Sequence, residues 1–513
     1  MTLPANRSNC VMAVLSLISG VKSSMQKIQL KMVVTTVAII LAVCVSASAV
    51  GKKRPKRHRT KTASSKQVIT PVRSIFVAPV TVQANTSSNS AASPSVATSA
   101  IISAARTSAP PIGDSASTST TTTDETASAP APSPAPAGGP LVISEFRVRG
   151  PNGANDEFIE IANNSGADHT VAGGGTGYAV AASDGVARCV IPNGTVIPNR
   201  GHYLCVNSVG YSLASYPAGN GTTATGDATY TTDIPDNAGI AIFNTSIAAN
   251  FNLANRFDAV GSTSEANTLY KEGTGYPALV PFSINSSFYR DNCGKGGSIT
   301  TFGACPTGGN LKDTNNNAAD FVFVDTNATS AGAGQRLGAP GPENLSSPIE
   351  RNASFAVTNL DTCVGSASPP NRVRDFTSDP PNNSTFGTLD RRITVTNNTG
   401  GNVTRLRFRV VDLTTFPAPS GIADLRPRTS NAVVVTVDRP PCGSGTSNVT
   451  VNGTTLEQPP SQPNGGGFNS SMSAGTITLA TPLANGASVD VRFLLGIQQT
   501  GSYRFFVNVE ALP

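Results

Sequence analysis

Residues 60–139 consist mainly of Ser, Thr, Ala and Pro and end in the run APAPSPAPAGG. This stretch lacks the periodic apolar side chains that could bury a core, so nothing would offset the entropy lost on ordering it. Pro-rich chain of this kind extends as polyproline II and acts as a semi-rigid spacer. We therefore predict a disordered stalk over residues 50–139, which is either a spacer that holds folded modules off a surface or an inert linker.

An apolar run at residues 32–45 precedes the stalk, with two lysines shortly before it and Ala-Ser-Ala at residues 47–49 after it. A basic region, a short apolar stretch and a small-residue cleavage site are the parts of a secretory signal peptide. We therefore expect residues 1–49 to be a signal peptide, cleaved after Ala49, or a membrane anchor. The chain is expected to be exported, and then secreted or displayed at the cell surface.

Several readings of this leader stay open. Leu-Ala-Val-Cys at residues 41–44 approaches a bacterial lipidation motif, although Val43 is bulkier than the usual small residue. An uncleaved anchor at residues 32–49 is an alternative, although the apolar run is short for a membrane span of about 20 residues. The region before the apolar run is long if translation starts at Met1, so Met25 is the other candidate start.

The net charge of +6 is unevenly distributed, because a basic cluster between Lys52 and Lys66 supplies most of it. The rest of the chain is close to neutral, which argues against a nucleic-acid-binding domain with basic side chains spread over a folded face. Basic residues directly after a leader resist translocation. The run at residues 52–59 either binds anionic envelope lipids or polysaccharide or is a solvated tail.

The remaining composition favours short strands. Only 13% of all residues are charged and 6% are aromatic, whereas Gly (48) and Pro (37) are frequent. Such a chain has few helix-favouring runs and many turn residues. We therefore expect an all-β protein with two tandem immunoglobulin-like β-sandwiches after the stalk.

The composition changes abruptly at Leu141, where LVISEFRVR predicts a strand. A Gly-Pro-Asn-Gly turn follows, and then a second predicted strand at residues 157–161. Phe158 and Ile161 fall on opposite faces of this strand, so neither face is wholly polar, as in a sandwich core. The first predicted sandwich covers residues 140–345, with further strands at residues 178–182, 188–191, 203–206, 239–243, 257–260 and 321–324.

Five stretches of this module occur in the following order: LVISEFRVRGPNGANDEFIEIANNS (141–165), GYAVAASDG (177–185), IPNGTVIPNRGHYLCVN (191–207), DIPDNAGIAIFN (233–244) and RFDAVG (256–261). Together they resemble the lamin-tail domain in its bacterial exported form. The resemblance implies a compact immunoglobulin-type sandwich on a secreted or surface protein, often beside hydrolase or adhesion modules. It implies no catalytic residues. The sequence departs from the family pattern at Ala162, where an aromatic is usual, and in a Gly/Thr insertion near residues 219–229.

A polar run before the strand at residues 321–324 resembles the start of a calcium-binding loop. Calcium ligands recur at alternate positions of such a loop, and oxygen-bearing side chains occur here in that pattern. However, Ala318 replaces the glycine expected at the sixth position, and Val324 replaces the glutamate expected at the twelfth. The alternative is a series of Asx turns. The weak calcium candidates are Asp313, Asn315, Asn317 and Asp320.

A Gly/Pro-rich joint at residues 338–342 separates the first module from a second predicted sandwich at residues 347–513. The alternating runs at residues 391–396 and 403–411 flank an Asn-Asn-Thr-Gly-Gly turn, which predicts a hairpin. Further strands are expected at residues 432–437, 476–480, 488–495 and 502–509.

The second strand of this predicted hairpin has two different faces. Leu406, Phe408 and Val410 point one way, and Arg405, Arg407 and Arg409 point the other way. Either the arginine row binds anionic glycans, or its charge keeps an exposed strand edge soluble.

Six cysteines lie outside the leader and form three groups of two by position. None of them shows the C-x-x-C spacing of zinc or thioredoxin-like sites. An even set of spaced cysteines in an exported chain favours disulfides over free buried thiols. The connectivity is open, but neighbouring strands would suit the first two and a long-range staple the last two. The candidates are Cys189, Cys205, Cys293, Cys305, Cys363 and Cys442.

Catalytic motifs are not found in the sequence. The three histidines are His58, His169 and His202, and no G-x-S-x-G motif accompanies them. The odd spacing of Glu157 and Glu160 puts them on opposite faces of a strand, so they do not form a glycosidase pair. There is no phosphate-binding glycine loop. We therefore expect a protein that is not an enzyme and has no cofactor, apart from the calcium candidate.

Two classes of function remain. The first is an exported or cell-surface binding or adhesion protein, whose partners would be envelope glycans or surface proteins, with no nucleic acid. The second is a structural component of the envelope or matrix, or an accessory module of an extracellular hydrolase system. Membrane association would occur through the N-terminal segment.

Overall fold

The computed structural model of the chain describes residues 139–217, 223–280, 283–291, 311–327 and 336–513. All of these residues belong to one compact unit, Val77–Pro513. The predictions for the leader, the basic run and the stalk therefore lie outside the described residues. No helix in the described part of the chain is long and apolar enough to cross a membrane.

The described part of the chain is almost entirely β, which confirms the predicted fold class. The strands of the first module are β1 (Leu141–Arg147), β2 (Phe158–Asn163), β3 (His169–Thr170), β4 (Gly177–Ala182), β5 (Ala187–Pro192), β6 (Val196–Ile197), β7 (His202–Asn207), β8 (Ala228–Tyr230), β9 (Ile240–Phe243), β10 (Arg256–Val260), β11 (Ser286–Arg290), β12 (Phe321–Asp325) and β13 (Arg336–Leu337).

The strands of the second module are β14 (Ile349–Glu350), β15 (Phe355–Asn359), β16 (Arg372–Asp375), β17 (Thr388–Asn397), β18 (Arg405–Leu413), β19 (Asp424–Arg428), β20 (Val433–Asp438), β21 (Thr446–Gly453), β22 (Thr455–Leu456), β23 (Ser471–Ser473), β24 (Ser488–Gln499) and β25 (Phe505–Leu512). The short helical turns are η1 (Ala248–Asn250), η2 (Thr268–Tyr270), α3 (Asn317–Asp320), η3 (Asn352–Ser354) and η4 (Pro380–Asn382).

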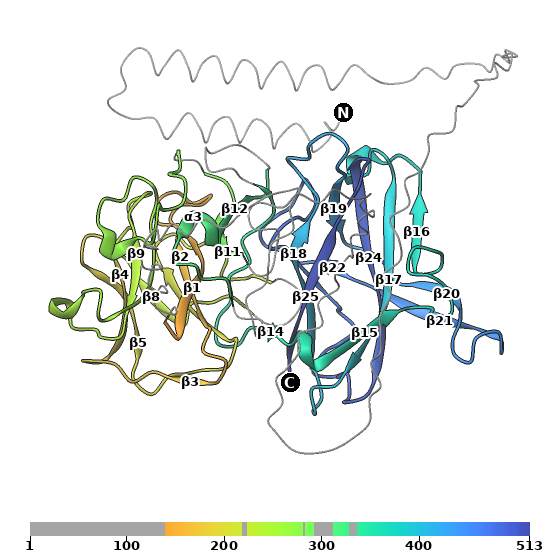
Figure 1. The fold of residues 1–513 in the computed structure, drawn as a ribbon, viewed down its shortest axis with the longest axis horizontal. Coiled ribbons are helices and arrows are strands. Elements are labelled where there is room, and N and C mark those ends of the chain that lie inside the picture. Colours follow the sequence, from red (N-terminus) through yellow and green to blue (C-terminus); the bar gives the residue numbers. More distant parts are fainter. Residues whose placement is uncertain (1–138, 218–222, 281–282, 292–310, 328–335) are drawn as a thin grey trace, which may run out of the picture. The chain divides into compact units, whose positions relative to one another are not determined.

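The first module is a sandwich of two main sheets (Figure 1). A seven-stranded sheet has the order β13-β12-β11-β1-β2-β7-β8, and a four-stranded sheet has the order β10-β9-β4-β5. Ile143 and Ile161 of the larger sheet and Val180 and Ile242 of the smaller sheet belong to one buried cluster. Alternation of apolar residues along each strand brings these side chains to the same inner layer.

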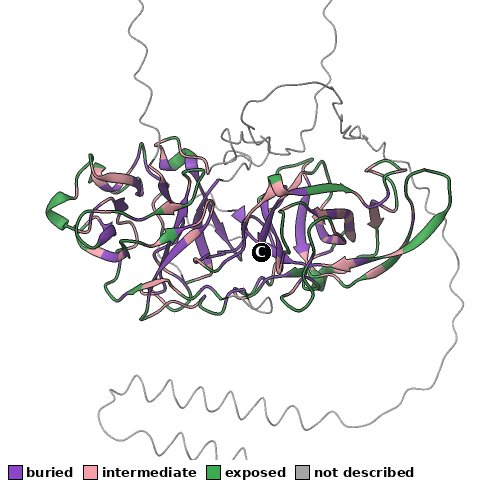
Figure 2. Cartoon of the chain, turned by 90° about the horizontal axis from the view of Figure 1, so that it is seen from below, coloured by how far each residue is buried: buried purple, intermediate pink, exposed green. Residues whose placement is uncertain are grey.

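The second module repeats this plan with different strands. A five-stranded sheet has the order β14-β25-β18-β23-β22, and a seven-stranded sheet contains β15, β17, β24, β21 and β20, with β16 beside β17 and β19 beside β24. Phe408 and Val509 of the first sheet share a core with Val395 and Phe493 of the second. Both sandwiches therefore have a core between two facing sheets, and buried residues follow the strands of both modules (Figure 2).

The prediction of a hairpin between residues 391–396 and 403–411 is wrong. The two strands exist as β17 and β18, but they lie in different sheets. β17 already pairs with β15 and β16 on one side and with β24 on the other, so no edge remains for β18. Asn397 Nδ2 donates to the carbonyls of Gly401 and Leu483, each at 2.8 Å, and so fixes a turn that crosses between the sheets.

A further strand prediction in the second module is wrong, and some strands of this module were not predicted. Residues 476–480 form turns instead of a strand, and Leu479 is 77% exposed. Conversely, β21 is one of the strands with no counterpart in the prediction, because its sequence TSNVTVNG is mostly polar and half of its residues are exposed. Hydrogen bonding to β20 and β24 forms this strand, so tertiary pairing outweighs its weak local propensity.

Two of the three expected disulfides lie within the described residues. Cys189 and Cys205 are bonded with a Cα–Cα distance of 6.2 Å, and Cys363 and Cys442 with 5.5 Å. The first bond does not join neighbouring strands of one sheet, because β5 and β7 belong to the two facing sheets of the sandwich. It therefore staples the two layers. The other two cysteines lie outside the described residues, at Cys293 and Cys305.

Candidate functional site

The outer face of the larger sheet of the first module is buried against the second module. Every residue of β1 and of β2 is buried, although each strand carries polar side chains on its outer face. A β-bulge in β1 lies between Ile143 and Glu145, so Ile143 and Phe146 both reach the inner core despite their odd spacing. Glu145 then points outward and accepts a hydrogen bond from Asn469 Nδ2 of the second module at 2.9 Å.

Charged side chains from both modules meet in this contact. β1, β2 and β7 contribute from the first module; β18, β25 and the segment between β22 and β23 contribute from the second; and the segment between the modules adds one glutamate. We call this group the charged layer; it consists of Glu145, Glu160, His202, Glu343, Arg407, Arg409, Glu457, Asn469 and Glu510.

The prediction that arginines alternate along β18 is correct, but the prediction that their side chains are exposed is wrong. β18 lies between β25 and β23 rather than at a sheet edge, and the first module covers its outer face. Arg407 is only 1% exposed and Arg409 only 7%. Both hypotheses for the row, a glycan-binding surface and a soluble strand edge, therefore fail for these two residues. The arginines instead neutralise buried glutamates.

Glu510 is the main partner of the two arginines. Arg407 Nε donates to its Oε2 at 2.5 Å, and Arg409 Nε donates to its Oε1 at 2.6 Å. Both guanidinium groups also contact Glu343 Oε1. Burial alone would raise the pKa of Glu510, but the two guanidinium groups hold that pKa below its ordinary value. Glu510 is therefore ionised within the layer.

Glu145 and Glu160 lie opposite one another on β1 and β2 and have different hydrogen-bond partners. Glu145 accepts from Ser287 Oγ at 2.6 Å, from Asn469 and from the backbone N–H of Gly341. Glu160 accepts from the Ser144 hydroxyl at 2.5 Å and from the Glu343 N–H at 2.7 Å.

Burial raises the pKa of both Glu145 and Glu160, and the Glu145 charge raises that of Glu160 further. Three neutral donors favour an ionised Glu145. The Ser144 hydroxyl can reverse its role and accept a hydrogen bond from the protonated carboxyl of Glu160. Glu160 is therefore the group that keeps its proton to higher pH.

His202 lies between two of these acids. Its Nε2 is 3.8 Å from Glu160 Oε1, and its Nδ1 is 3.3 Å from Glu343 Oε2. Burial, together with the nearby Arg409 and Arg407 charges, lowers the pKa of His202 to about 3. The imidazole is therefore neutral at ordinary pH, and its contacts with the two acids are not ion pairs.

The same three residues are one of two described groups with donor atoms close enough to hold a metal ion. One oxygen or nitrogen from each of Glu160, His202 and Glu343 lies within 4.8 Å of the others. However, Glu160 Oε1 already accepts a hydrogen bond from Ser144, and Glu343 Oε1 already pairs with Arg407. A cavity of about 70 Å³ adjoins the group, which is room for a few waters.

The second group surrounds Arg290 inside the first module. Arg290 is 1% exposed, and its Nη2 lies 2.6 Å from Asp258 Oδ2. Its Nη1 lies 3.4 Å from Asp313 and 3.6 Å from Asp320. Asp258, Glu272 and Asp313 have donor atoms within 4.8 Å of one another, but the guanidinium supplies the positive charge at their centre.

The four calcium candidates do not converge on one point. Asp313 and Asp320 face Arg290, whereas Asn317 Oδ1 accepts from the backbone N–H groups of Gly261 and Glu272, each at 3.0 Å. The backbone N–H of Asn315 donates to Asp313 Oδ1 at 3.3 Å in an Asx turn. Within the described residues, this run therefore serves as a set of polar turns around an internal cation.

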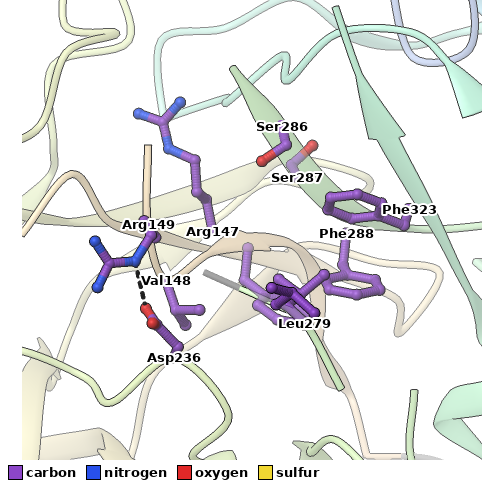
Figure 3. A pocket seen from close by; sticks show the side chains of 11 residues that line it. Arg147, Val148, Arg149, Asp236, Leu279, Ser286, Ser287, Phe288 and Phe323 are labelled. Atoms are coloured by element: carbon purple, nitrogen blue, oxygen red, sulfur yellow. Dashed lines mark hydrogen bonds and ion pairs between the residues drawn. The ribbon is translucent and has the colours of Figure 1, made fainter. Parts of the chain in front are cut away.

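The small pocket in Figure 3 is also too narrow for a ligand. It lies beside β1 and β11 and is lined by Phe288, Phe323 and Leu279, and Arg149 Nε pairs with Asp236 at 2.9 Å near it. Its volume is about 10 Å³, which holds one water.

Glu157 and His169 both make hydrogen bonds within the first module. Glu157 is buried and accepts from Ile234 N and Asn207 Nδ2, so it points away from the partners of Glu160, as the odd spacing predicted. His169 Nε2 lies 3.3 Å from the hydroxyl of Tyr178. Glu343 and Glu510 could not be identified from the sequence, because no local motif marks them and their roles depend on pairing with the arginines of β18.

Comparison with models of known protein families, with curated proteins and with solved structures found no match for this chain.

Proposed function

We propose that this chain is a non-catalytic, exported or cell-surface binding protein that presents two β-sandwich modules as one body on the segment at residues 50–139. The charged layer carries this proposal. Glu145 of the first module accepts from Asn469 of the second, and Arg407 and Arg409 pair with Glu343 of the segment between the modules, so these contacts hold the two modules together. The outer strands and loops are left as the surface that meets partners.

The disulfides support export. Disulfides persist in oxidising compartments and are rare in the cytosol. Each module has one of the described bonds, Cys189–Cys205 in the first and Cys363–Cys442 in the second. The leader-like residues 1–49 and the resemblance of residues 141–261 to the exported lamin-tail domain point to the same location.

Cell fractionation followed by intact-mass analysis tests the proposal. We expect to find the chain outside the cytoplasm. Its mass should correspond to a chain that begins at Val50, or to one that carries a lipid on Cys44, and both described disulfides should be oxidised. Limited protease treatment of whole cells should release the two modules together. A reduced chain in the cytoplasm that begins at Met1 would contradict the proposal.

A further inference from the structure

A group of arginine and aromatic side chains lies at the margin of the second module, far from the charged layer. β16 pairs only with β17, so it is an edge strand of the larger sheet. Alternate residues of this strand share one side, and Arg372, Arg374 and Phe376 follow that spacing. Tyr503 precedes β25 of the facing sheet, and its hydroxyl accepts from Arg372 Nη1 at 3.1 Å. The group therefore spans both layers of the sandwich.

Phe376 is 79% exposed, and it is nevertheless held in place. The guanidinium of Arg374 stacks on it, with Cζ 4.3 Å from the ring centroid. Arg374 is itself fixed, because its Nη1 and Nη2 donate to the carbonyls of Asp375, Phe386 and Thr388. A large apolar ring that is already ordered loses little entropy when a ligand covers it.

Gly387 makes this arrangement possible. Its φ is +81°, and a Cβ at this position would lie 2.1 Å from the carbonyl oxygen of Asp375. Only glycine lets the chain pass so close to the end of β16. The close approach brings the Phe386 carbonyl onto Arg374 and leaves the Phe386 side chain 48% exposed beside it.

Within the described residues, the cations of this group donate hydrogen bonds to neutral partners. Arg372 donates to the Ala367 carbonyl and to Tyr503, and Arg391, its cross-strand neighbour, donates to Asn359 Oδ1 at 3.1 Å and to the Ser366 carbonyl. Among the described residues, no carboxylate forms an ion pair with Arg372, Arg374 or Arg391. The arginines of the charged layer form ion pairs with glutamates, whereas in this margin Asp375 acts on Arg374 alone among the three arginines, and the group keeps a net positive charge.

We propose that this aromatic–arginine patch binds an acidic polysaccharide built of uronic-acid sugars; it consists of Arg372, Arg374, Phe376, Phe386, Arg391 and Tyr503. The apolar C–H face of a sugar ring packs on the exposed face of Phe376, and the planar carboxylate of the sugar matches the guanidinium of Arg372. A single nucleic-acid strand would need a continuous basic groove along its backbone. This inference rests on the proposed function, because it names the ligand and the surface of that binding protein.

Titration of the purified, exported chain with polygalacturonate tests the inference, with uncharged dextran and a single-stranded oligonucleotide as competing ligands. We expect saturable binding to polygalacturonate that weakens with salt, and much weaker binding to the other two. The substitution Phe376→Ala should weaken binding about tenfold through loss of the stacked ring. Arg372→Lys keeps the charge but loses the planar fork, and should also weaken binding about tenfold.

Leu479→Ala is the matched control, because Leu479 is an equally exposed apolar residue of the same module. It should bind polygalacturonate like the unmodified chain. Absence of polygalacturonate binding, equal binding of dextran, tighter binding of the oligonucleotide, or unchanged binding by Phe376→Ala would each overturn the inference. The titration uses purified protein, so it fails or succeeds independently of the fractionation result that tests export.

Discussion

Two of the buried arginine clusters in the described part of the chain differ in what surrounds them. Arg290 lies within the first module, and its ion-pair partners, Asp258, Asp313 and Asp320, all come from that module. Arg407 and Arg409 belong to the second module and neutralise acids from the junction between the modules as well as from their own sheet. The first cluster therefore stabilises one fold, and the second couples two folds.

The difference shows in how the carboxyl groups titrate. Around Arg290, burial and the neighbouring aspartates raise the pKa of Glu272 to about 9. In the charged layer, Arg407 and Arg409 hold Glu510 ionised, while Glu160 keeps its proton. The layer contains five glutamates and two arginines, so acid is in excess there. Contact between the modules should therefore depend more on pH than a balanced ion pair would.

The largest effect is expected from Arg290→Met. Removal of one partner from a buried ion pair leaves uncompensated charge and costs about 4 kcal/mol. Hydrogen exchange read by mass spectrometry reports local opening in each module separately. We expect the loss of protection in β1, β10, β11 and β12, with β24 and β25 unchanged. Equal loss of protection in both modules would show that the Arg290 cluster is not confined to the first module.

The disulfides extend the comparison between the modules. Cys189 and Cys205 are 5% and 0% exposed, whereas Cys442 lies in a run of exposed residues. We expect mild reductant to open Cys363–Cys442 first, because a thiolate must reach the sulfur that it attacks. Peptide mapping after alkylation measures the order.

Replacement of Cys363 and Cys442 by Ser should destabilise the second module by about 3 kcal/mol, because this bond closes a long loop in the unfolded chain. Hydrogen exchange on the double variant measures that loss, with the first module as the internal reference. Earlier reduction of Cys189–Cys205 would contradict the expected difference between the two bonds.

The sequence predicted most strands of the first module, because apolar alternation and turn residues mark each strand locally. The path from β17 to β18 was not predictable in this way. The same alternation that suits a hairpin also suits two strands that face one core from opposite sheets, and only the pairing of β17 with β24 decides between them. Likewise, the arginine alternation was visible, but the burial of Arg407 depends on a second module whose docking no local pattern encodes.

Two neighbouring glutamates test the assignment of the proton in the charged layer. In Glu145→Gln, the new amide N–H₂ would face either the Gly341 N–H, which is itself a donor, or the Asn469 side chain. Asn469 Oδ1 already accepts from Arg409 Nη1 at 2.8 Å. An unsatisfied buried donor costs about 2 kcal/mol, so this variant should be destabilised at all pH values. In Glu160→Gln, the amide oxygen can accept from Glu343 N–H and the amide nitrogen can donate to Ser144 Oγ.

Glu160→Gln should also change how stability depends on pH. The folded pKa of Glu160 is raised above its ordinary value of 4.5, so its contribution to stability is complete below about 4.5 and is lost as the pH rises through the folded pKa. Glu160→Gln cannot lose a proton, so its stability should fall less between acid and neutral pH than that of the unmodified chain. Urea unfolding at a series of pH values measures this slope. An unchanged slope in Glu160→Gln would place the proton elsewhere in the layer.

The smallest effect is expected from Arg439→Met, which sets the scale for the buried clusters. Arg439 pairs with Asp490 at 2.9 Å, but its side chain is 42% exposed, so water screens the pair. Such pairs contribute less than about 1 kcal/mol, and salt weakens them further. Hydrogen exchange under the conditions used for Arg290→Met should show little change in β20 or β24. If Arg439→Met instead cost as much as Arg290→Met, burial would not be the cause of the difference between these ion pairs, and the explanation given for Arg290 would have to be abandoned.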